Sequence, residues 1–237
     1  MIDHKRKRTT AILICLLAAL CLLLGCAKKD AEPVTSLEQL NSPDRKIGMA
    51  DNTGDEKLVA EKLPQAKIEF YKEGMTGYLA VGQGKLDAFV YGKLSMETAI
   101  QNGLKGVRLL DETLGESYVM GVGLSPRTKI SDLENKINAF LDEIKANGTL
   151  DEIADRWLVR KEMQMPEIEI PETSDTHLIV GTSGVYEPFT FYAGTELAGY
   201  DIELAYRFAA WLGATIEFKV YDYDGIVPAA QSGDVDC

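Results

Sequence analysis

The sequence contains the same pattern twice: an apolar helix, a glycine, one further residue, an aliphatic residue, an aspartate and a small residue. The first copy is GYLAVGQGKLDAFVYG at residues 77–92, and the second is IVPAAQSGDVDC at residues 226–237. Each copy predicts a helix that ends at a glycine and leads into a buried strand. A helix-to-strand step that recurs along a chain favours an α/β fold built from two related units.

Strand and helix patterns alternate through the first half of the chain. Strands that alternate with helices predict a parallel sheet with helices on its faces, and Gly84 is placed to end one of those helices. The expected strands are KIGMA (46–50), IEFY (68–71), LDAFVY (86–91), GVRLL (106–110) and YVMGVGL (118–124), and the expected helices begin near Glu56 and cover residues 75–83 and 95–102.

The most regular amphipathic pattern lies at residues 129–158. Ser131 is the expected N-cap, with Glu134 three residues later, and Gly148 is expected to end the helix. A second short helix at residues 150–158 is expected to carry Trp157 inward. The apolar residues at helical spacing are Leu133, Ile137, Phe140, Leu141 and Ile144.

Residues 161–176, KEMQMPEIEIPETSDT, contain two prolines and several acids, and we interpret them as a linker. Beyond them the pattern resumes. Strands are expected at residues 178–182, 190–192 and 215–221, helices at 199–213 and 226–233, a turn at DYDG (222–225), and an opening strand at VDC (235–237).

The N-terminus predicts export. Basic residues at HKRKR (4–8) precede an apolar run at residues 11–24, which is typical of a signal peptide. The run ends in Leu-Leu-Gly-Cys, which resembles the lipobox of bacterial lipoproteins; this implies removal of residues 1–25 and lipidation (palmitate) of Cys26, with residues 26–35 as a tether. The alternative is an uncleaved short anchor with a chance cysteine.

Composition excludes several function classes. The 237 residues carry 25 Lys plus Arg and 37 Asp plus Glu, a formal net charge of -12, which disfavours a nucleic-acid partner. His4 lies in the signal region, His177 stands alone before a strand, and the sequence has no Cys/His cluster at metal-ligand spacing. We therefore expect no catalytic residues, no metal and no cofactor.

The second half of the chain resembles a known family. Its runs GYDIELA (199–205) and DGIVPA (224–229) are similar to the opening of bacterial extracellular solute-binding proteins of family 3. Residues 36–160 resemble the second half of such proteins, including the return helices that end them. The halves therefore stand in reversed order, which fits either a tandem array or a circular permutation.

The resemblance implies an α/β, periplasmic-binding-protein-like (type II) fold with two lobes, parallel-type sheets flanked by helices, and an incomplete second unit. The implied segments are 36–160 (second-half type) and 177–237 (first-half type). Family strands after Asp236, with a ligand-binding Thr and Arg, are expected to be missing. Sheet edge and apolar helix faces should then be exposed, and the chain alone is expected not to bind tightly.

The resemblance also implies a function. It predicts a membrane-anchored extracytoplasmic protein, not an enzyme, that captures a small polar, amino-acid-like solute and delivers it to an ABC transporter permease. The alternative is a sensor ectodomain or a non-catalytic binding module of a larger exoprotein, related to cell-wall enzymes or dehydratases.

Candidate ligand-binding residues follow from the same resemblance. Phe189 is interpreted as core, and Asp87 and Asp236 as caps of strands and turns. Gly92 stands where the family has an ammonium-binding aspartate, so a carboxylate is missing there. The candidate residues are Ser183, Tyr186 and Tyr223 on one side, and Asp51, Asn52 and Thr53, a polar loop at a helix N-terminus that includes Gly54, on the other.

Overall fold

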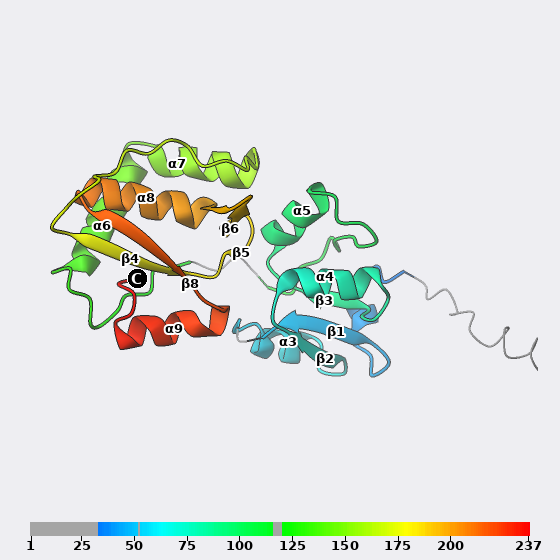
Figure 1. The fold of residues 1–237 in the computed structure, drawn as a ribbon. Coiled ribbons are helices and arrows are strands. Elements are labelled where there is room, and N and C mark those ends of the chain that lie inside the picture. Colours follow the sequence, from blue (N-terminus) through cyan, green and yellow to red (C-terminus); the bar gives the residue numbers. More distant parts are fainter. Residues whose placement is uncertain (1–32, 52, 116–119) are drawn as a thin grey trace, which may run out of the picture. The chain divides into compact units, whose positions relative to one another are not determined.

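A computed structural model describes residues 33–51, 53–115 and 120–237. The helices and strands that it describes lie in the unit Ser36–Cys237 (Figure 1). The expected signal peptide and Cys26 lie outside the described residues. Within the described ranges, no helix combines the length and the apolar character that crossing a membrane requires.

The first part of this unit contains a parallel sheet of order β2-β1-β3. Ile47, in the central strand, pairs with Ile68 on one side and Ala88 on the other, and it is fully buried. The helices follow the strands, as the alternation predicts, and Gly84 lies just beyond the end of α4. The elements are α2 (Leu37–Leu40), β1 (Lys46–Ala50), α3 (Glu56–Lys62), β2 (Lys67–Tyr71), α4 (Gly74–Gly82), β3 (Ala88–Val90) and α5 (Lys93–Gln101).

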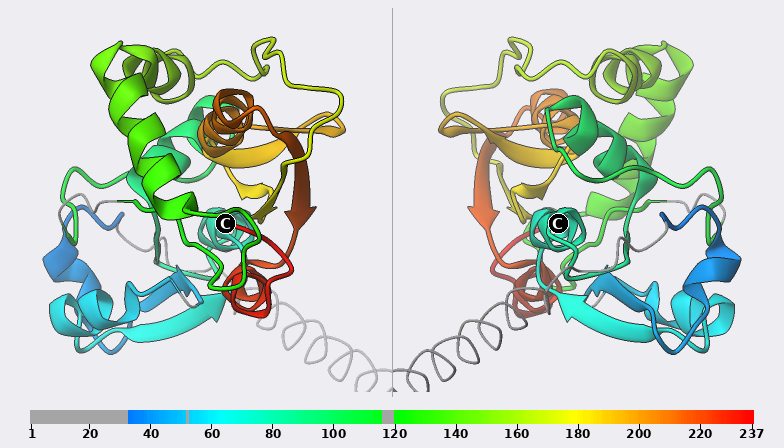
Figure 2. Two further views of the ribbon diagram at one scale, coloured as in Figure 1. Left: turned by 90° about the vertical axis from the view of Figure 1, so that its left-hand side faces the viewer. Right: turned by 90° about the vertical axis from the view of Figure 1, so that its right-hand side faces the viewer.

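The second part contains the parallel pair β4–β8 and an antiparallel sheet of order β5-β6-β7. Figure 2 shows α8 between the β4–β8 pair and α6. The elements are α6 (Leu133–Ala146), α7 (Thr149–Ala154), the π-helix η1 (Asp155–Val159), β4 (His177–Thr182), β5 (Val185–Tyr186), β6 (Thr190–Ala193), β7 (Glu196–Ala198), α8 (Tyr200–Leu212), β8 (Thr215–Val220) and α9 (Tyr223–Ser232).

The two aspartates of the repeated pattern make equivalent contacts. The Asp87 carboxylate accepts the backbone N–H of Lys46 at 2.8 Å, at the start of β1. The Asp236 carboxylate accepts the backbone N–H of Ile179 at 2.9 Å, in β4. Each carboxylate also has a second donor, from Arg45 or from Thr128. The interpretation of both aspartates as strand and turn caps is confirmed.

Some expected elements differ from the structure. Residues 106–110 and 120–124 form no strand; an apolar run predicts extended backbone, but a strand also needs a partner, and Gly121 and Gly123 weaken the second run. The N-cap of α6 is Asp132 rather than Ser131. The DYDG turn is instead the first turn of α9.

Residues 235–237, where a strand is expected, make backbone hydrogen bonds to β4. Asp236 N–H donates to the Ile179 carbonyl at 2.7 Å, and Gly181 N–H donates to the Cys237 carbonyl at 2.8 Å. These backbone bonds place the three residues beside β4, on the edge opposite β8, although they are not assigned as a strand. The order is therefore β8, β4 and then residues 235–237, with the first strand of the part in the middle. The first sheet has the equivalent order β2-β1-β3.

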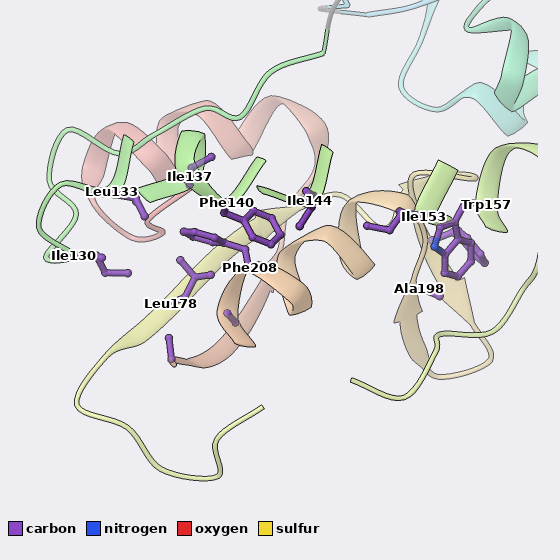
Figure 3. Close-up of a cluster of buried hydrophobic side chains, with 13 residues drawn as sticks. Ile130, Leu133, Ile137, Phe140, Ile144, Ile153, Trp157, Leu178, Ala198 and Phe208 are labelled. Atoms are coloured by element: carbon purple, nitrogen blue, oxygen red, sulfur yellow. The ribbon is translucent and has the colours of Figure 1, made fainter. Parts of the chain in front are cut away.

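The main hydrophobic cluster joins residues from both sides of the interpreted linker (Figure 3). Phe140 of α6 lies 5.3 Å from Phe208 of α8, measured between ring centroids. Trp157 of η1 is fully buried, as expected, and its ring contacts Phe191 of β6. Each buried side chain of this size stabilises the fold by about 1.5–3 kcal/mol. Residues 161–176 contain no helix or strand, yet Met165 and Ile170 pack against the same cluster.

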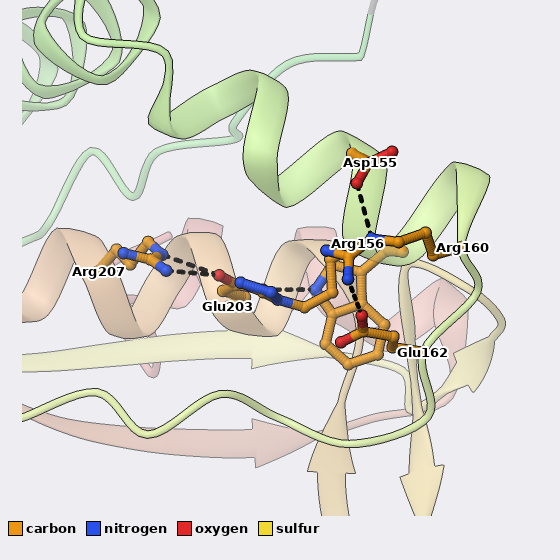
Figure 4. Close-up of polar contacts among 7 residues, drawn as sticks. Asp155, Arg156, Arg160, Glu162, Glu203 and Arg207 are labelled. Atoms are coloured by element: carbon orange, nitrogen blue, oxygen red, sulfur yellow. Dashed lines mark hydrogen bonds and ion pairs between the residues drawn. The ribbon is translucent and has the colours of Figure 1, made fainter.

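A buried carboxylate ties the same two segments together (Figure 4). Glu203 of α8 is fully buried, and it accepts the indole N–H of Trp157 at 2.7 Å. Arg156 donates to Glu203 at 3.2 Å, and Arg207, one helical turn along α8, donates at 2.9 Å. Buried charges are tolerated when they are paired and hydrogen-bonded in this way. We call Glu203, Trp157, Arg156 and Arg207 the Glu203 clamp.

Candidate functional site

The candidate site residues follow the carboxyl ends of parallel strands, on loops or at the start of the next element. In open α/β sheets, ligands bind at this end, because the following helices begin there with free backbone N–H groups. The loop after β1 carries Asp51 and Thr53, and the loop after β3 carries Tyr91 and Gly92. The residues after β4 include Ser183 and Tyr186, and Tyr223 follows β8.

Tyr186 is a predicted site residue that contacts two other aromatic rings and approaches Gly92. Its ring stacks on Phe189, with centroids 5.0 Å apart and planes at 19°. It also meets Tyr91 edge to face, with ring centroids 5.6 Å apart. A Cβ atom built on Gly92 would lie 2.9 Å from the Tyr186 hydroxyl oxygen. The hydroxyl of Tyr186 therefore approaches the position where the family pattern has an aspartate.

The other predicted residues of this side differ in exposure. Ser183 is buried, and its hydroxyl oxygen accepts the Val185 N–H at 3.5 Å. Tyr223 is 52% exposed at the first position of α9. Phe189 is buried, which confirms its interpretation as core. The ligand-binding roles of Ser183, Tyr186 and Tyr223 stay predictions.

The polar loop after β1 is held by its own backbone and side chains. Asp51 is exposed, and its N–H donates to the Tyr71 carbonyl at 2.9 Å. The Thr53 hydroxyl donates to the Ala50 carbonyl at 3.2 Å. Asn52 lies outside the described residues. The anion-binding role of this loop before α3 stays a prediction.

Two buried hydroxyls near this site did not emerge from the sequence patterns. Tyr78 of α4 and Ser95 of α5 are each 6% exposed, and within the described part of the chain their hydroxyl oxygens have no hydrogen-bond partner. Tyr78 meets Tyr91 edge to face at 5.8 Å. The signal in the sequence was a hydroxyl-bearing residue on the inner face of a helix, which patterning alone assigns to the core.

Burial shifts the pKa of two acidic groups in this region. It raises the pKa of Asp201, in the first turn of α8, to about 7. It also raises the pKa of Glu187, although the hydrogen bond from Asn102 opposes that shift. In the ranges that the structure covers, no cluster of His, Cys, Asp and Glu could hold a metal ion.

Comparison with known families finds a match within the second part of the chain. The profile "Bacterial extracellular solute-binding proteins, family 3" matches residues 178–237. Those residues contain β4 to α9 and both runs on which the expected resemblance rests.

Individual relatives agree with this match. The chain is similar to the "Putative ABC transporter arginine-binding protein 2" of Escherichia coli (strain K12), with 26% identity over 52% of this chain and 50% of that protein. It is also similar to the "Arginine-binding extracellular protein ArtP" of Bacillus subtilis (strain 168), with 37% identity over 27% of this chain and 26% of that protein. The chain thus spans about half the length, or less, of the curated relatives that it matches.

Among solved structures, one similar chain is "An ancestral arginine-binding protein bound to glutamine". The identity is 29%, the TM-score is 0.44, and 57% of each chain is covered.

Proposed function

Since the chain carries a segment of the bacterial extracellular solute-binding proteins, family 3, we propose that it captures a small polar, amino-acid-like solute and delivers it to an ABC transporter. The observation that carries this proposal is the family match at residues 178–237. The two parallel sheets support it, because both present loops at the carboxyl ends of their strands. Relatives named as ABC transporter amino-acid-binding proteins also support it.

The chain works as a binder rather than an enzyme in this proposal, outside the cytoplasm. Residues 1–25 are its signal peptide, and lipidated Cys26 anchors it to the membrane. Tyr186 and Tyr223 cover the solute with their rings, Ser183 hydrogen-bonds it, and the loop with Asp51, Asn52 and Thr53 holds an anionic group. The segments 36–160 and 177–237 are joined by the linker 161–176.

Calorimetric titration of the full chain with polar amino acids and related small solutes tests the binding proposal. We expect weak but saturable binding heat with at least one solute class, since the chain alone is not expected to bind tightly. A matching small rise of the unfolding midpoint should accompany it, because a ligand that binds only the folded state stabilises it. A flat response across all classes would contradict the proposal. Metabolic labelling with a palmitate analogue, with Cys26→Ser as the control, tests the anchor.

A further inference from the structure

We infer that the second part of the chain holds a separate binding site for an organic cation, a quaternary ammonium ion with an apolar body. The site is a pocket of about 550 Å³ lined by the interpreted linker, the β6–β7 hairpin, α8 and β8. None of its lining residues is a candidate for the solute site, so the inference does not depend on the proposed function. We call it the Tyr206 pocket, and its lining includes Met165, Ile168, Tyr192, Glu196, Tyr206 and Phe218.

The pocket has the size of a ligand site. Pockets that hold small molecules measure about 300–1,000 Å³. Its walls come from segments far apart in the sequence: Met165, Pro166 and Ile168 belong to the linker, whereas Phe218 and Val220 belong to β8. Phe218 and Val220 are two positions apart, so they lie on one face of their strand. The linker thus does more than connect two segments, because it forms one wall of a cavity.

Three aromatic rings line the pocket. Tyr206 of α8 and Phe218 of β8 lie 5.2 Å apart between ring centroids, with their planes at 53°. Tyr192 of β6 adds a third ring, and it is 50% exposed, so part of that ring is open to a ligand. The face of an aromatic ring attracts a cation that lies within about 6 Å of the ring centroid. Rings from three elements around one space are therefore suited to a cationic group.

The lining carries charge of one sign. Of the described residues around the pocket, Glu196 alone is charged, and its carboxylate forms no ion pair or hydrogen bond with the described chain. Burial and, to a smaller extent, this carboxylate raise the pKa of Tyr206, so the negative charge is near that ring. A cation in the pocket would be attracted by the carboxylate and by the ring faces, whereas an anion would be repelled by both.

The remaining lining residues decide which cation fits. Met165, Ile168 and Leu197 present apolar side chains, so the ligand gains from an apolar body. A primary ammonium group carries three N–H donors that need acceptors, whereas a quaternary ammonium group carries apolar substituents and no donor. Quaternary ammonium ions are the ligands that aromatic rings recognise in this way. The pocket therefore fits an alkyl- or aryl-trimethylammonium ion.

Calorimetric titration of the full chain tests this class. The chain is titrated with benzyltrimethylammonium, and with choline against its uncharged isostere, in which a tert-butyl group replaces the trimethylammonium group. An ionic strength of about 0.15 M screens the net charge of -12. We expect saturable binding of benzyltrimethylammonium, and at least about fivefold tighter binding of choline than of its isostere. Equal binding of the pair, or no binding of benzyltrimethylammonium, overturns the inference.

Two variants test whether the cation lies in the pocket. Tyr192→Leu removes a ring and Glu196→Gln removes the charge, and each should weaken benzyltrimethylammonium binding about fivefold or more. Tyr192→Phe keeps the ring, and Glu61→Gln removes an equal charge at an exposed position of α3, so both should bind as the wild type does. All these side chains are exposed, so the variants should fold. Unchanged affinity in Tyr192→Leu and Glu196→Gln would place the cation elsewhere and overturn the inference.

A competition experiment separates the Tyr206 pocket from the solute site. Saturating benzyltrimethylammonium should leave the affinity for an amino-acid-like solute unchanged within about twofold, because the two sites share no residue. Displacement of the solute would show that the cation occupies the solute site, which overturns the inference and leaves the proposed function standing. Cation binding that depends on Tyr192 and Glu196 in a chain that binds no amino-acid-like solute would support the inference and contradict the proposed function.

Discussion

Replacing Glu203 by glutamine tests whether the Glu203 clamp holds the two sides of the interpreted linker together. Glutamine keeps the size of the side chain and one carbonyl acceptor but removes the charge. In the wild type, one fully buried carboxylate serves the Trp157 indole and two guanidinium groups, at distances of 2.7 to 3.2 Å. The substitution leaves the charges of Arg156 and Arg207 without their counter-ion.

The structure sets the magnitude. Breaking a buried ion pair by removing one partner costs about 3–5 kcal/mol. The side chains of Arg156 and Arg207 are 16% and 27% exposed, so water recovers part of that cost. We therefore expect Glu203→Gln to lower the free energy of unfolding by about 3 kcal/mol, at the lower end of that range.

Urea unfolding followed by tryptophan fluorescence measures this change, because Trp157 is itself in the clamp. The matched control is Glu143→Gln. Glu143 of α6 also accepts an indole N–H, from Trp211 of α8 at 2.8 Å, but at an exposed position. That substitution should cost less than about 1 kcal/mol. Equal losses in the two variants would refute the reasoning, because burial would then contribute nothing.

Other substitutions probe separate features. Asp201→Asn should be more stable than the wild type at pH 8 by up to about 4 kcal/mol, and nearly equal to it near pH 4. Burial raises the pKa of Asp201 from 3.8 to about 7, so the wild type loses stability as the pH rises from about 4 through 7, and urea unfolding at both pH values measures the difference. Asp236→Ala removes the acceptor for Thr128 and for a backbone N–H of β4, and should cost about 1–3 kcal/mol by urea unfolding. The backbone φ of Gly199 is +126°, and in Gly199→Ala the new Cβ would lie 2.3 Å from the Phe189 carbonyl oxygen. We expect the free energy of unfolding to fall by about 2 kcal/mol or more in the same assay. A smaller fall would mean that the loop moves to make room for the methyl group.

Periodicity predicted most of the fold because it acts locally. The buried strands, the helices after them and the glycines that end α4 and α6 depend on residues close in sequence. The sequence-based predictions were wrong where a strand depends on a partner that is distant in the sequence. Residues 106–110 and 120–124 have apolar character, but no strand is assigned there. The tie between Glu203 and Trp157 spans the interpreted linker, and no local pattern contains it.

The candidate site was only partly predictable for the same reason. The resemblance directed attention to Gly92 and Tyr186, which the structure brings into contact. Tyr78 and Ser95 looked like ordinary members of the inner faces of their helices, because a pattern records which side a residue faces and not whether its hydroxyl has a partner. Whether a hydroxyl has a hydrogen-bond partner is known only from the three-dimensional structure.

Two of the hydrophobic clusters among the described residues occupy different stretches of the chain, and this has a consequence for synthesis. One cluster draws its buried residues from positions 78–99, and the other draws them from 130–214. A chain that emerges from its N-terminus can complete the first cluster early. The helices α6 and α7 then leave the ribosome with their apolar faces uncovered, and must wait for α8 to be made. During that interval they are the surface on which a chaperone would act and from which aggregation would start.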